Sequence, residues 1–462
     1  MTVRRHRFSA RDSFSDRLPP AVLFATVWLI LPNLVFVPLW FVGGPPRPLA
    51  IMAYVLVGLA GRMLPIWVVA ALLLAAFGLD VVLVVSGIFN LAPTSILHAI
   101  RFLPELKIFE SNQYLILTIL VGVVFVTILS ARGQYRRRLR QASAVPALLS
   151  AGLLMAGDHL INVSPEQEFG RYLKPTAPFH SAMAGSGLRE RLANPTGRNL
   201  VMVMVESMGH LENPEHRRLL TRPFDRPGLR ERYQVEMGYA PFYGSTTAAE
   251  LRELCGRWAR FDEFLDAPDR TCLPARLATA GYRTLSVHGF TGDLFDRRRW
   301  YPNIGFEELR FAEEMYRPGD RICDGVFAGL CDIDVADRVA GLLDQTQDRP
   351  HFIHWLTLNT HLPVIHRSDR RHLQCEGIDT PLDVVMVCSM TELWIELFDG
   401  IIEIAMTERP RPTDFLIVGD HAPPFWIRRS KAMFVPGQVP WILLRDRRNV
   451  ADGNIAAADA DN

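Results

Sequence analysis

Long apolar runs in the first third of the chain constrain its fold most strongly. Residues 21–44 are almost entirely apolar, and this run is long enough to cross roughly 30 Å of hydrocarbon as one helix. The run at 48–90 is interrupted only around Arg62 and Pro65, which predicts two spans joined by a tight turn. With two later runs, the pattern predicts about five membrane-spanning helices, at 21–44, twice within 48–90, at 114–131 and at 144–157.

The positions of the arginines predict how the chain crosses the membrane. Arginines gather before the first run, near residue 62 and again at 132–140, and cytoplasmic loops are enriched in Arg and Lys. Five spans then place the N-terminus in the cytoplasm and everything after about residue 160 outside it. If the run at 144–157 did not cross, the same rule would place the rest of the chain inside.

The stretch at 94–112, between the third and fourth expected spans, carries apolar residues at helical spacing. This pattern is typical of an amphipathic helix that lies flat on a membrane surface. An ordinary helix in a loop has the same pattern, so the sequence leaves both interpretations open.

The cysteines give an independent indication of the compartment. All six lie beyond residue 254, and the apolar part of the chain has none. An even number of cysteines in the polar part favours disulfides in an oxidising compartment. The alternative is a set of unpaired buried thiols in a cytosolic domain. Because no Cys-x-x-Cys pair is present, a zinc ribbon is not expected.

The pattern changes after a polar, proline-containing linker. Near-continuous apolar runs begin near residues 199, 282, 351 and 413, and helical stretches separate them. Buried parallel strands that alternate with helices predict an α/β domain, with a mostly parallel sheet between two layers of helices. The expected organisation is a transmembrane anchor at 1–159, a linker at 160–197, an extracytoplasmic α/β domain at 198–445 and a disordered tail at 446–462.

Residue types that bind metals or carry protons stand where these strands are expected to end. Sites in parallel sheets form beyond the carboxyl ends of the strands. A single polar residue at a strand end is often only a cap, but four such ends meet at one edge. The residues are Glu206, His288, Thr360 with His361, and Asp420 with His421.

Carboxylates combined with imidazole, without thiolates, suggest one divalent ion, zinc or manganese, in an open site. A candidate nucleophile lies in the turn from Gly244 to Thr247, which precedes a strongly helical sequence. A hydroxyl at a helix start meets the positive end of the helix dipole, which favours an alkoxide and a phosphoryl group. A plain N-cap would show the same residues.

Together these residues resemble the alkaline phosphatase superfamily, and most of all its membrane-anchored lipoteichoic acid synthases and phosphoethanolamine transferases. The resemblance covers about 198–445 and includes the five-span anchor. The family motif Gly-x-Thr-x-x-x-Glu matches Gly244, Thr246 and Glu250, which selects Thr246 over Thr247 as the nucleophile. The resemblance implies that four residues bind one divalent metal: Glu206, Thr246, Asp420 and His421.

Two further segments are similar to family segments that contact the substrate. The segment 288–306 implies that His288 contacts the phosphoryl group, that Phe295 lines a headgroup pocket and that Arg297 binds the headgroup. The segment "LNTHLPV" implies that His361 lies beside the nucleophile. It departs from the glycine-rich segment of the phosphoethanolamine transferases, and this leaves the transferred headgroup open between phosphoethanolamine and phosphoglycerol.

The sequence Cys272-Leu-Pro-Ala-Arg matches the Cys-x-Pro-x-Arg motif that sulfatases convert to a formylglycine nucleophile. In the resemblance, however, this stretch corresponds to a helix and strand that follow the nucleophile segment. Cys272 is therefore expected to be a disulfide partner, with Cys255 as its mate. Because sequence neighbours close short loops, the other expected pairs are Cys323–Cys331 and Cys375–Cys388.

The expected function is metal-dependent transfer of a phospholipid headgroup, through a phospho-threonine, to a cell-envelope glycan or lipid. Outside the cytoplasm no ATP pool is available, so a membrane phospholipid is the expected donor. Either His361 or His288 protonates the leaving oxygen. The alternatives are a phosphodiester or sulfate ester hydrolase of the same fold, and a non-enzymatic membrane sensor.

The expected location is the inner membrane, with several spans and a periplasmic catalytic domain. The formal net charge of +1 gives no reason to expect a nucleic-acid partner. A monomer is expected.

Overall fold

The computed structural model describes residues 18–42, 44–88, 93–105, 112–162, 179–193, 197–242, 244–345, 348–364, 372–375, 381–425 and 427–448. The chain divides into two compact units. We call Met1–Val85 with Asn112–Val163 the helical unit, and Ser86–Ser111 with Ser164–Asn462 the α/β unit. Of the expected disordered tail at 446–462, only residues 446–448 lie within the described part.

Within the described residues, the helical unit contains three helices that are long and apolar enough to cross a membrane, judged by length and composition. Two further apolar stretches, Pro20–Leu34 and Pro48–Ala60, are shorter. The prediction of about five full spans was therefore imprecise. The first run is divided, with a break before Pro38, and the helix Pro48–Ala60 has only 13 residues. The elements are α1 (Pro20–Ala25), η2 (Thr26–Ile30), α2 (Leu31–Leu34), α3 (Pro38–Val42), α4 (Pro48–Ala60), α5 (Ile66–Ile88), α7 (Asn112–Gln134), α8 (Arg136–Gln141) and α9 (Val145–Asn162).

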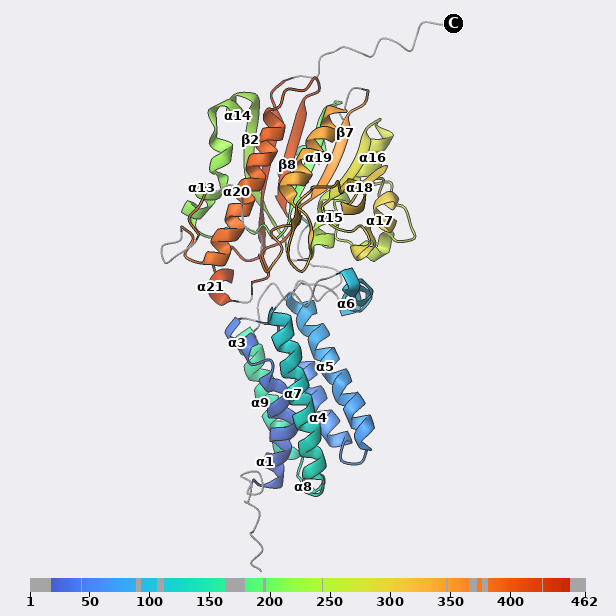
Figure 1. Ribbon diagram of the computed structural model, residues 1–462, viewed down its shortest axis with the longest axis vertical. Coiled ribbons are helices and arrows are strands. Elements are labelled where there is room, and N and C mark those ends of the chain that lie inside the picture. The colour runs from blue at the N-terminus through green and yellow to red at the C-terminus, as the bar shows by residue number, and fades with distance from the viewer. Residues whose placement is uncertain are drawn as a thin grey trace, which may run out of the picture. The chain divides into compact units, whose positions relative to one another are not determined.

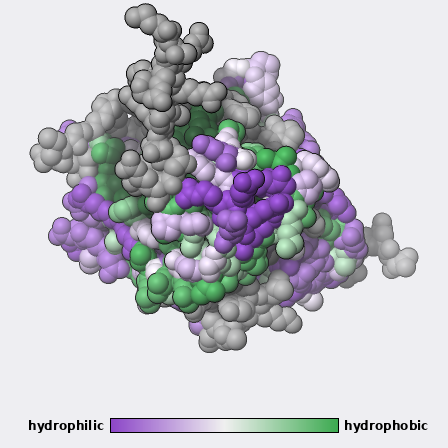
Figure 2. All heavy atoms as spheres, turned by 90° about the horizontal axis from the view of Figure 1, so that it is seen from below, coloured by the Kyte–Doolittle hydropathy of each residue, from purple (hydrophilic) through white to green (hydrophobic). Residues whose placement is uncertain are grey.

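The basic segments of the helical unit meet at one of its ends. Arg132 donates to the carbonyl oxygens of Gly61 and Leu64, at 3.0 and 2.6 Å, and Arg140 donates to that of Arg62 at 2.6 Å. In Figure 1, α8 lies at the lower end of this unit, and Figure 2 shows hydrophilic side chains gathered among apolar ones in the view from below. This contact agrees with the predicted topology, in which the loops at 61–65 and 132–140 lie on the same side of the membrane.

A polar cluster lies buried inside the helical unit. Arg47, which is 3% exposed, donates through Nε and Nη2 to the two carboxylate oxygens of Asp80, at 2.8 and 2.6 Å. Tyr54 donates to the same carboxylate at 2.8 Å. Asp158 accepts from the backbone N–H of Arg47 at 2.6 Å and from the indole of Trp40 at 2.8 Å. Both carboxylates are thus fully buried and hydrogen-bonded.

The α/β unit is built on a seven-stranded sheet in the order β2-β9-β8-β1-β7-β3-β4. Figure 1 labels β2, β8 and β7 in this sheet. The five strands from β8 to β4 are parallel, and β9 and β2 extend this sheet through antiparallel pairings. The mostly parallel α/β fold is therefore confirmed. The bounds are β1 (Asn199–Val205), β2 (Tyr233–Pro241), β3 (Arg283–His288), β4 (Glu308–Arg310), β7 (His351–Leu356), β8 (Thr413–Gly419) and β9 (Gln438–Asp446).

Helices cover both faces of the sheet, as its apolar strands require. Alternate side chains of β1 point to opposite faces, so Val203 packs with α19 and α20 while Met202 packs with α15, α16 and α17. The helices are α11 (Ala182–Gly185), α12 (Leu188–Arg191), α13 (Pro214–Thr221), α14 (Pro227–Arg232), α15 (Thr246–Leu254), α16 (Leu273–Thr279), α17 (Arg297–Asn303), α18 (Ala312–Met315), α19 (Asp332–Asp344), α20 (Val385–Met406) and α21 (Arg428–Lys431).

Smaller elements complete the α/β unit. Part of the expected linker folds as α11 and α12, whose apolar residues join the core on the α15 face. A short second sheet pairs two strands near the carboxyl edge of the main sheet. The remaining elements are β5 (Ile322–Cys323), β6 (Gly329–Leu330), α6 (Pro93–Ala99), η3 (Ile100–Glu105), η5 (Arg222–Asp225), η6 (Phe261–Phe264) and η7 (Leu294–Asp296).

All six cysteines form disulfides in the α/β unit, and all three expected pairs are confirmed. They join Cys255 to Cys272, Cys323 to Cys331 and Cys375 to Cys388. No cysteine remains free.

Candidate active site

Two neighbouring parallel strands bring the acidic residues of the site together. Val205 at the end of β1 is in register with Gly419 at the end of β8. Glu206 and Asp420 follow these two positions directly, so their side chains emerge side by side at the carboxyl edge of the sheet. Glu206 is 5% exposed and Asp420 is fully buried.

The side chain of Thr246 points to these carboxylates from the first position of α15. Its hydroxyl lies 2.9 Å from Asp420 Oδ2, 3.5 Å from Glu206 Oε2 and 3.4 Å from His421 Nε2. One ligand atom from each of Glu206, Asp420 and His421 lies within 4.8 Å of the others. The structure therefore brings together all four residues that were expected to bind a metal.

The backbone around Ser207 fixes the carboxylates. Ser207 adopts a left-handed conformation with φ of 55°, which is rare for a residue other than glycine. In this conformation its N–H donates to Asp420 Oδ1 at 2.7 Å, and its hydroxyl donates to Glu206 Oε1 at 2.9 Å. The N–H of His421 also donates to Asp420 Oδ1, at 2.6 Å. Thus Asp420 Oδ1 is held by the backbone, and Oδ2 faces Thr246.

The imidazole of His421 is oriented as a ligand. Its Nδ1 lies 3.0 Å from the carbonyl oxygen of Ala422 and must donate to it, so Nε2 of a neutral ring carries a lone pair. Nε2 lies 3.3 Å from Asp420 Oδ2 and 3.8 Å from Glu206 Oε1. This imidazole nitrogen therefore faces the same space as the two carboxylates.

The electrostatics of the cluster favour a bound cation. Burial, followed by the charge of Glu206, raises the pKa of Asp420 to about 7. Burial alone would lower the pKa of His421, but Asp420 and Glu206 raise it overall. Among the described residues, no lysine or arginine forms an ion pair with either carboxylate. Two carboxylates, one imidazole and one hydroxyl fit zinc or manganese, which take oxygen and nitrogen ligands.

The neighbouring Thr247 has a different environment. It is 4% exposed, and its hydroxyl lies 3.2 Å from that of Ser245. Only Thr246 among these three hydroxyl residues is within 3.5 Å of the carboxylates. The choice of Thr246 over Thr247 as candidate nucleophile thus agrees with the geometry.

The imidazole rings of His288 and His361 are each oriented by a contact between Nδ1 and a backbone carbonyl oxygen. Nδ1 of His288, at the end of β3, lies 3.0 Å from the carbonyl oxygen of Leu356, and Nδ1 of His361 lies 2.8 Å from that of Leu362. Burial, helped by Arg297, lowers the pKa of His288 to about 3. Burial, with a smaller effect of His421, lowers the pKa of His361 to about 4. Both rings are neutral at neutral pH.

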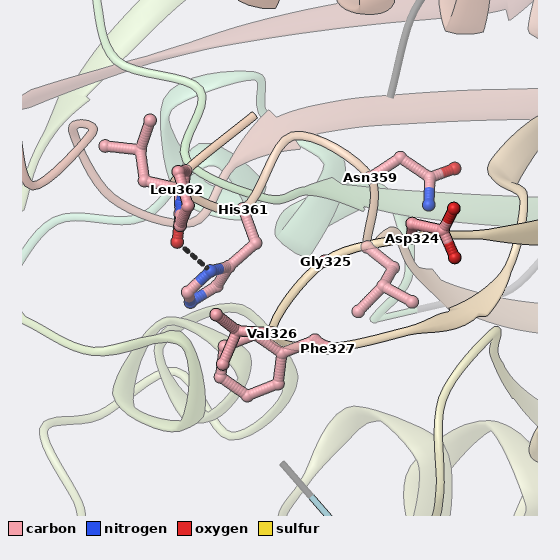
Figure 3. Close-up of a pocket in the computed structure, with 9 residues that line it drawn as sticks. Asp324, Gly325, Val326, Phe327, Asn359, His361 and Leu362 are labelled. Atoms are coloured by element: carbon pink, nitrogen blue, oxygen red, sulfur yellow. Dashed lines mark hydrogen bonds between the residues drawn. The ribbon is translucent and has the colours of Figure 1, made fainter. Parts of the chain in front are cut away.

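A small pocket lies beside His361, and Figure 3 shows its lining. The ring of Phe327, from the loop between β5 and β6, lies 4.1 Å from that of His361. Asp332 holds the loop before His361 by accepting the N–H groups of Leu358 and Asn359, at 3.0 and 2.8 Å. Sequence reasoning missed these contacts, because neither Phe327 nor Asp332 stands in a recognisable motif.

The structure places Arg297 differently from the expected headgroup-binding residue. Arg297 is 2% exposed, and its Nε and Nη2 donate to the two oxygens of Glu250 at 3.2 Å each. Tyr301 donates to the same carboxylate. The guanidinium of Arg297 is therefore hydrogen-bonded inside the protein through Nε and Nη2. The structure does not bring Arg297 into the cluster around Thr246. Glu250 is the last residue of the motif that selected Thr246.

Phe295, the expected pocket residue, is partly buried and has φ of 57°, and Asp296 after it has φ of 54°. Two consecutive left-handed residues other than glycine mark a strained segment, and such strain is concentrated at functional sites. The Phe295 ring packs edge to face with Phe261, at 5.9 Å between centroids. Its role as a headgroup contact stays a prediction.

The sulfatase-like Cys272 does not lie at a helix start that faces the cluster. It is fully buried and bonded to Cys255. A cysteine in a disulfide cannot serve as the precursor of formylglycine, so the formylglycine interpretation is not supported.

Comparisons with known proteins show what this chain is similar to. Residues 198–376 match the family model described as Sulfatase. The match includes Glu206 and Thr246 and ends before Asp420 and His421, which β8 supplies. A protein of Rhizobium meliloti (strain 1021), whose name assigns it provisionally to cyclic beta-1,2-glucan modification, is 28% identical over 227 residues, or 46% of this chain. The chain spans about a third, 34%, of the length of that relative.

Two solved structures to which this chain is similar are a lipoteichoic acid synthase and a phosphoglycerol transferase. The lipoteichoic acid synthase LtaP from Listeria monocytogenes is 17% identical, with a TM-score of 0.40 over 54% of this chain and 65% of that one. The Streptococcus pyogenes phosphoglycerol transferase GacH, in complex with sn-glycerol-1-phosphate, is 14% identical, with a TM-score of 0.40 over 58% and 76%.

A third similar structure is the zinc complex of the periplasmic domain of EcEptC from Escherichia coli. It is 15% identical, with a TM-score of 0.37 over 55% of this chain and 74% of that one. The family match therefore shows that residues 198–376, which include Glu206 and Thr246, are similar to the Sulfatase family.

Proposed function

We propose that this chain is a membrane-anchored phosphotransferase that moves a phospholipid headgroup, phosphoethanolamine or phosphoglycerol, to a glycan of the cell envelope. The observation that carries the proposal is the Thr246 hydroxyl, 2.9 Å from Asp420 Oδ2 at the first position of α15. A hydroxyl in this position meets both an acidic cluster that attracts a cation and the N–H groups of a helix start.

The reaction takes place in two displacements. First, the Thr246 hydroxyl gives up its proton as its oxygen bonds to phosphorus, and the bond from phosphorus to the diacylglycerol oxygen breaks as that oxygen takes up a proton. Then the acceptor hydroxyl gives up its proton as its oxygen bonds to phosphorus, and the bond from phosphorus to the Thr246 oxygen breaks as that oxygen takes up a proton. A divalent zinc or manganese ion held by Glu206, Thr246, Asp420 and His421 would lower the pKa of the hydroxyl and offset phosphoryl charge.

His361 is the candidate for moving these protons. Its Nδ1 donates to the Leu362 carbonyl, and its pKa is lowered to about 4, so the neutral ring accepts a proton at Nε2. The neutral imidazole is the protonation state that a general base requires. Asp332 and Phe327 hold the loop and the ring in place, which supports a fixed position for this base.

Donor, acceptor and compartment follow from other features of the chain. Three disulfides favour an oxidising compartment outside the cytoplasm, where ATP is absent and phospholipid is at hand. Helices able to cross the membrane would keep the site near that lipid. The relative named for glucan modification favours a glycan over a lipid as acceptor.

The test compares three variants of the purified full-length protein on phospholipid vesicles with manganese or zinc. Thr246→Ala should lower headgroup release by orders of magnitude, because it removes both the nucleophile and a ligand. Thr247→Ala is the matched control and should stay near wild type. Cys272→Ser should lose about 3 kcal/mol of stability through the missing disulfide, with its chemistry intact.

Two results would contradict the proposal. One is turnover by folded Thr246→Ala at the wild-type rate, and the other is a folded but inactive Cys272→Ser. Mass spectrometry of the products then separates transfer from hydrolysis. A transferase yields phosphorylated glycan, whereas a hydrolase releases the free headgroup phosphate even when glycan is present.

A further inference from the structure

The segment Pro93–Glu105, formed by α6 and η3, belongs to the α/β unit although it lies between two membrane-spanning candidates in the sequence. Phe102 is 8% exposed and packs in one cluster with Phe290, Leu294 and Leu358. Arg101 forms an ion pair with Asp296. One side of the segment is thus attached to the α/β unit.

This attachment is close to the candidate active site along the chain. Phe290 follows His288 by two residues, and Leu358 precedes His361 by three. Leu358 is also the residue whose N–H Asp332 accepts. The segment therefore packs on the loop that follows His288 and on the loop that carries His361.

The other side of the segment is apolar and uncovered. Leu97 is 55% exposed and Ile100 is 50% exposed. These two residues are three apart in a helical stretch, so they share a face. Among the described residues, neither belongs to a hydrophobic cluster of the α/β unit.

Chain length restricts what can cover this face. Residues 89–92 join α5, a candidate span, to α6, and five Cα-to-Cα steps cover at most about 18 Å of extended chain. After η3, the chain must return to the candidate span within α7, which begins at Asn112. As consecutive spans, α5 and α7 would meet the same membrane surface at the ends that this segment joins, which would keep the segment within reach of the lipid headgroups.

We propose that Pro93–Glu105 is an interfacial strap with two faces. Phe102 and Arg101 hold it on the α/β unit, and Leu97 and Ile100 insert into the boundary between headgroups and acyl chains. Amphipathic helices at this boundary bury their apolar face by about 5–10 Å. Of the two interpretations that the sequence left open, this selects the interfacial one.

The strap has a consequence for catalysis, which rests on the proposed function. By resting on the loops of His288 and His361, it keeps the candidate site beside the bilayer that holds the donor lipid. A phosphodiester buried at the headgroup level then needs to move little to reach Thr246.

Depth-dependent quenching tests the insertion without measuring activity. Because all native cysteines are in disulfides, Leu97→Cys or Ile100→Cys in the full chain gives one thiol for a bimane label. The matched control is Glu215→Cys on α13, where the Glu215 side chain is 79% exposed. Each labelled protein is placed in vesicles with and without brominated acyl chains.

We expect brominated lipid to quench the labels at 97 and 100 several-fold more than the label at 215. Equal, weak quenching at all three positions would overturn the strap. A second measurement uses Leu97→Asp/Ile100→Asp, with turnover of vesicle lipid compared with turnover of a soluble phosphodiester. Loss of lipid turnover alone is expected, and equal loss of both would assign the segment to the α/β unit rather than to the bilayer.

Discussion

The helical unit and the α/β unit both bury carboxylates, and they satisfy them in different ways. In the helical unit, the guanidinium of Arg47 neutralises Asp80 through two hydrogen bonds, and Tyr54 adds a third. In the α/β unit, Glu206 and Asp420 share one space with His421 and Thr246, and no described lysine or arginine pairs with them.

The difference separates a structural contact from a binding site. A buried charge is costly unless it is paired, so a cluster that is complete by itself needs no ligand. The Arg47–Asp80 pair is complete in this sense, and its role is to hold helices together. The cluster around Asp420 has two carboxylates and one imidazole directed at a common point, which leaves negative charge for a cation to offset. The same residue types therefore lead to opposite expectations on mutation.

The largest effect is expected from breaking the complete cluster. Arg47→Met leaves Asp80 buried without its cation and should destabilise the folded chain by about 3–5 kcal/mol. Unfolding of the full-length protein in detergent measures this loss. Metal binding by the α/β unit should be unchanged, because Arg47 contacts nothing in that cluster.

The matched control is the double variant Arg47→Met/Asp80→Leu, which removes the pair together. It should recover most of the lost stability, because replacing a buried pair with apolar residues is often neutral. If the single variant were as stable as the wild type, the pair would not be the contact that holds this unit.

In the absence of metal, Asp420→Asn and Asp80→Asn should change the stability of the folded protein in opposite directions. With chelator at pH 8, Asp420 is ionised beside Glu206, so the amide should stabilise the protein or leave it unchanged. Manganese at 100 times its dissociation constant should add about 2.7 kcal/mol to the wild type and little to Asp420→Asn. Asp80→Asn should lose stability with or without metal.

Protons compete with metal in this cluster, and the sign is fixed by the raised pKa of Asp420. The pKa of Asp420 is about 7 in the folded protein, above its value in the unfolded chain. In the absence of metal, the folded protein therefore loses stability as the pH rises from the unfolded pKa to about 7. Metal affinity should therefore weaken as pH drops below about 7. Titration calorimetry at two pH values measures both effects. Equal affinity at pH 6 and pH 8 would contradict a buried Asp420 as ligand.

Much of the α/β fold was predictable because buried parallel strands leave a plain pattern. The runs that became β1 and β8 are largely apolar, and Glu206 and Asp420 follow them directly, while β3 ends at His288 itself. β2 was missed because an edge strand with mixed burial has no such run. The cluster around Thr246 followed from residues at strand and helix ends, which local sequence determines.

What the sequence did not reveal depends on contacts between distant residues. Arg297 matched a family position, but its pairing with Glu250 depends on how α17 packs against α15. Ser207 adopts a positive φ, a conformation that the sequence would suggest only at a glycine. The first apolar stretch is helical from Pro20 to Leu34, and α3 begins after a turn, at Pro38. A continuous run of apolar residues did not show where this helix ends.

The smallest effect concerns His354, a buried polar group. It is fully buried on β7 near the rings of Tyr301 and Phe306, and neither of its ring nitrogens has a hydrogen-bond partner among the described residues. Burial, followed by Arg297, lowers its pKa to about 3. Below about pH 6.5, His354 takes up a proton in the unfolded chain but stays neutral in the folded protein.

His354 should therefore remove about 1.4 kcal/mol of stability for each pH unit between roughly 6.5 and 4. His354→Leu should reduce the acid loss by this one proton, and at pH 7.5 it should be at least as stable as the wild type, because it removes unsatisfied polar atoms. Urea unfolding of both proteins at pH 7.5, 6 and 5 gives the difference directly, since every other titrating group is shared. Parallel stability curves for the two proteins would mean that His354 is protonated in the folded state, and its burial without a partner would then need another explanation.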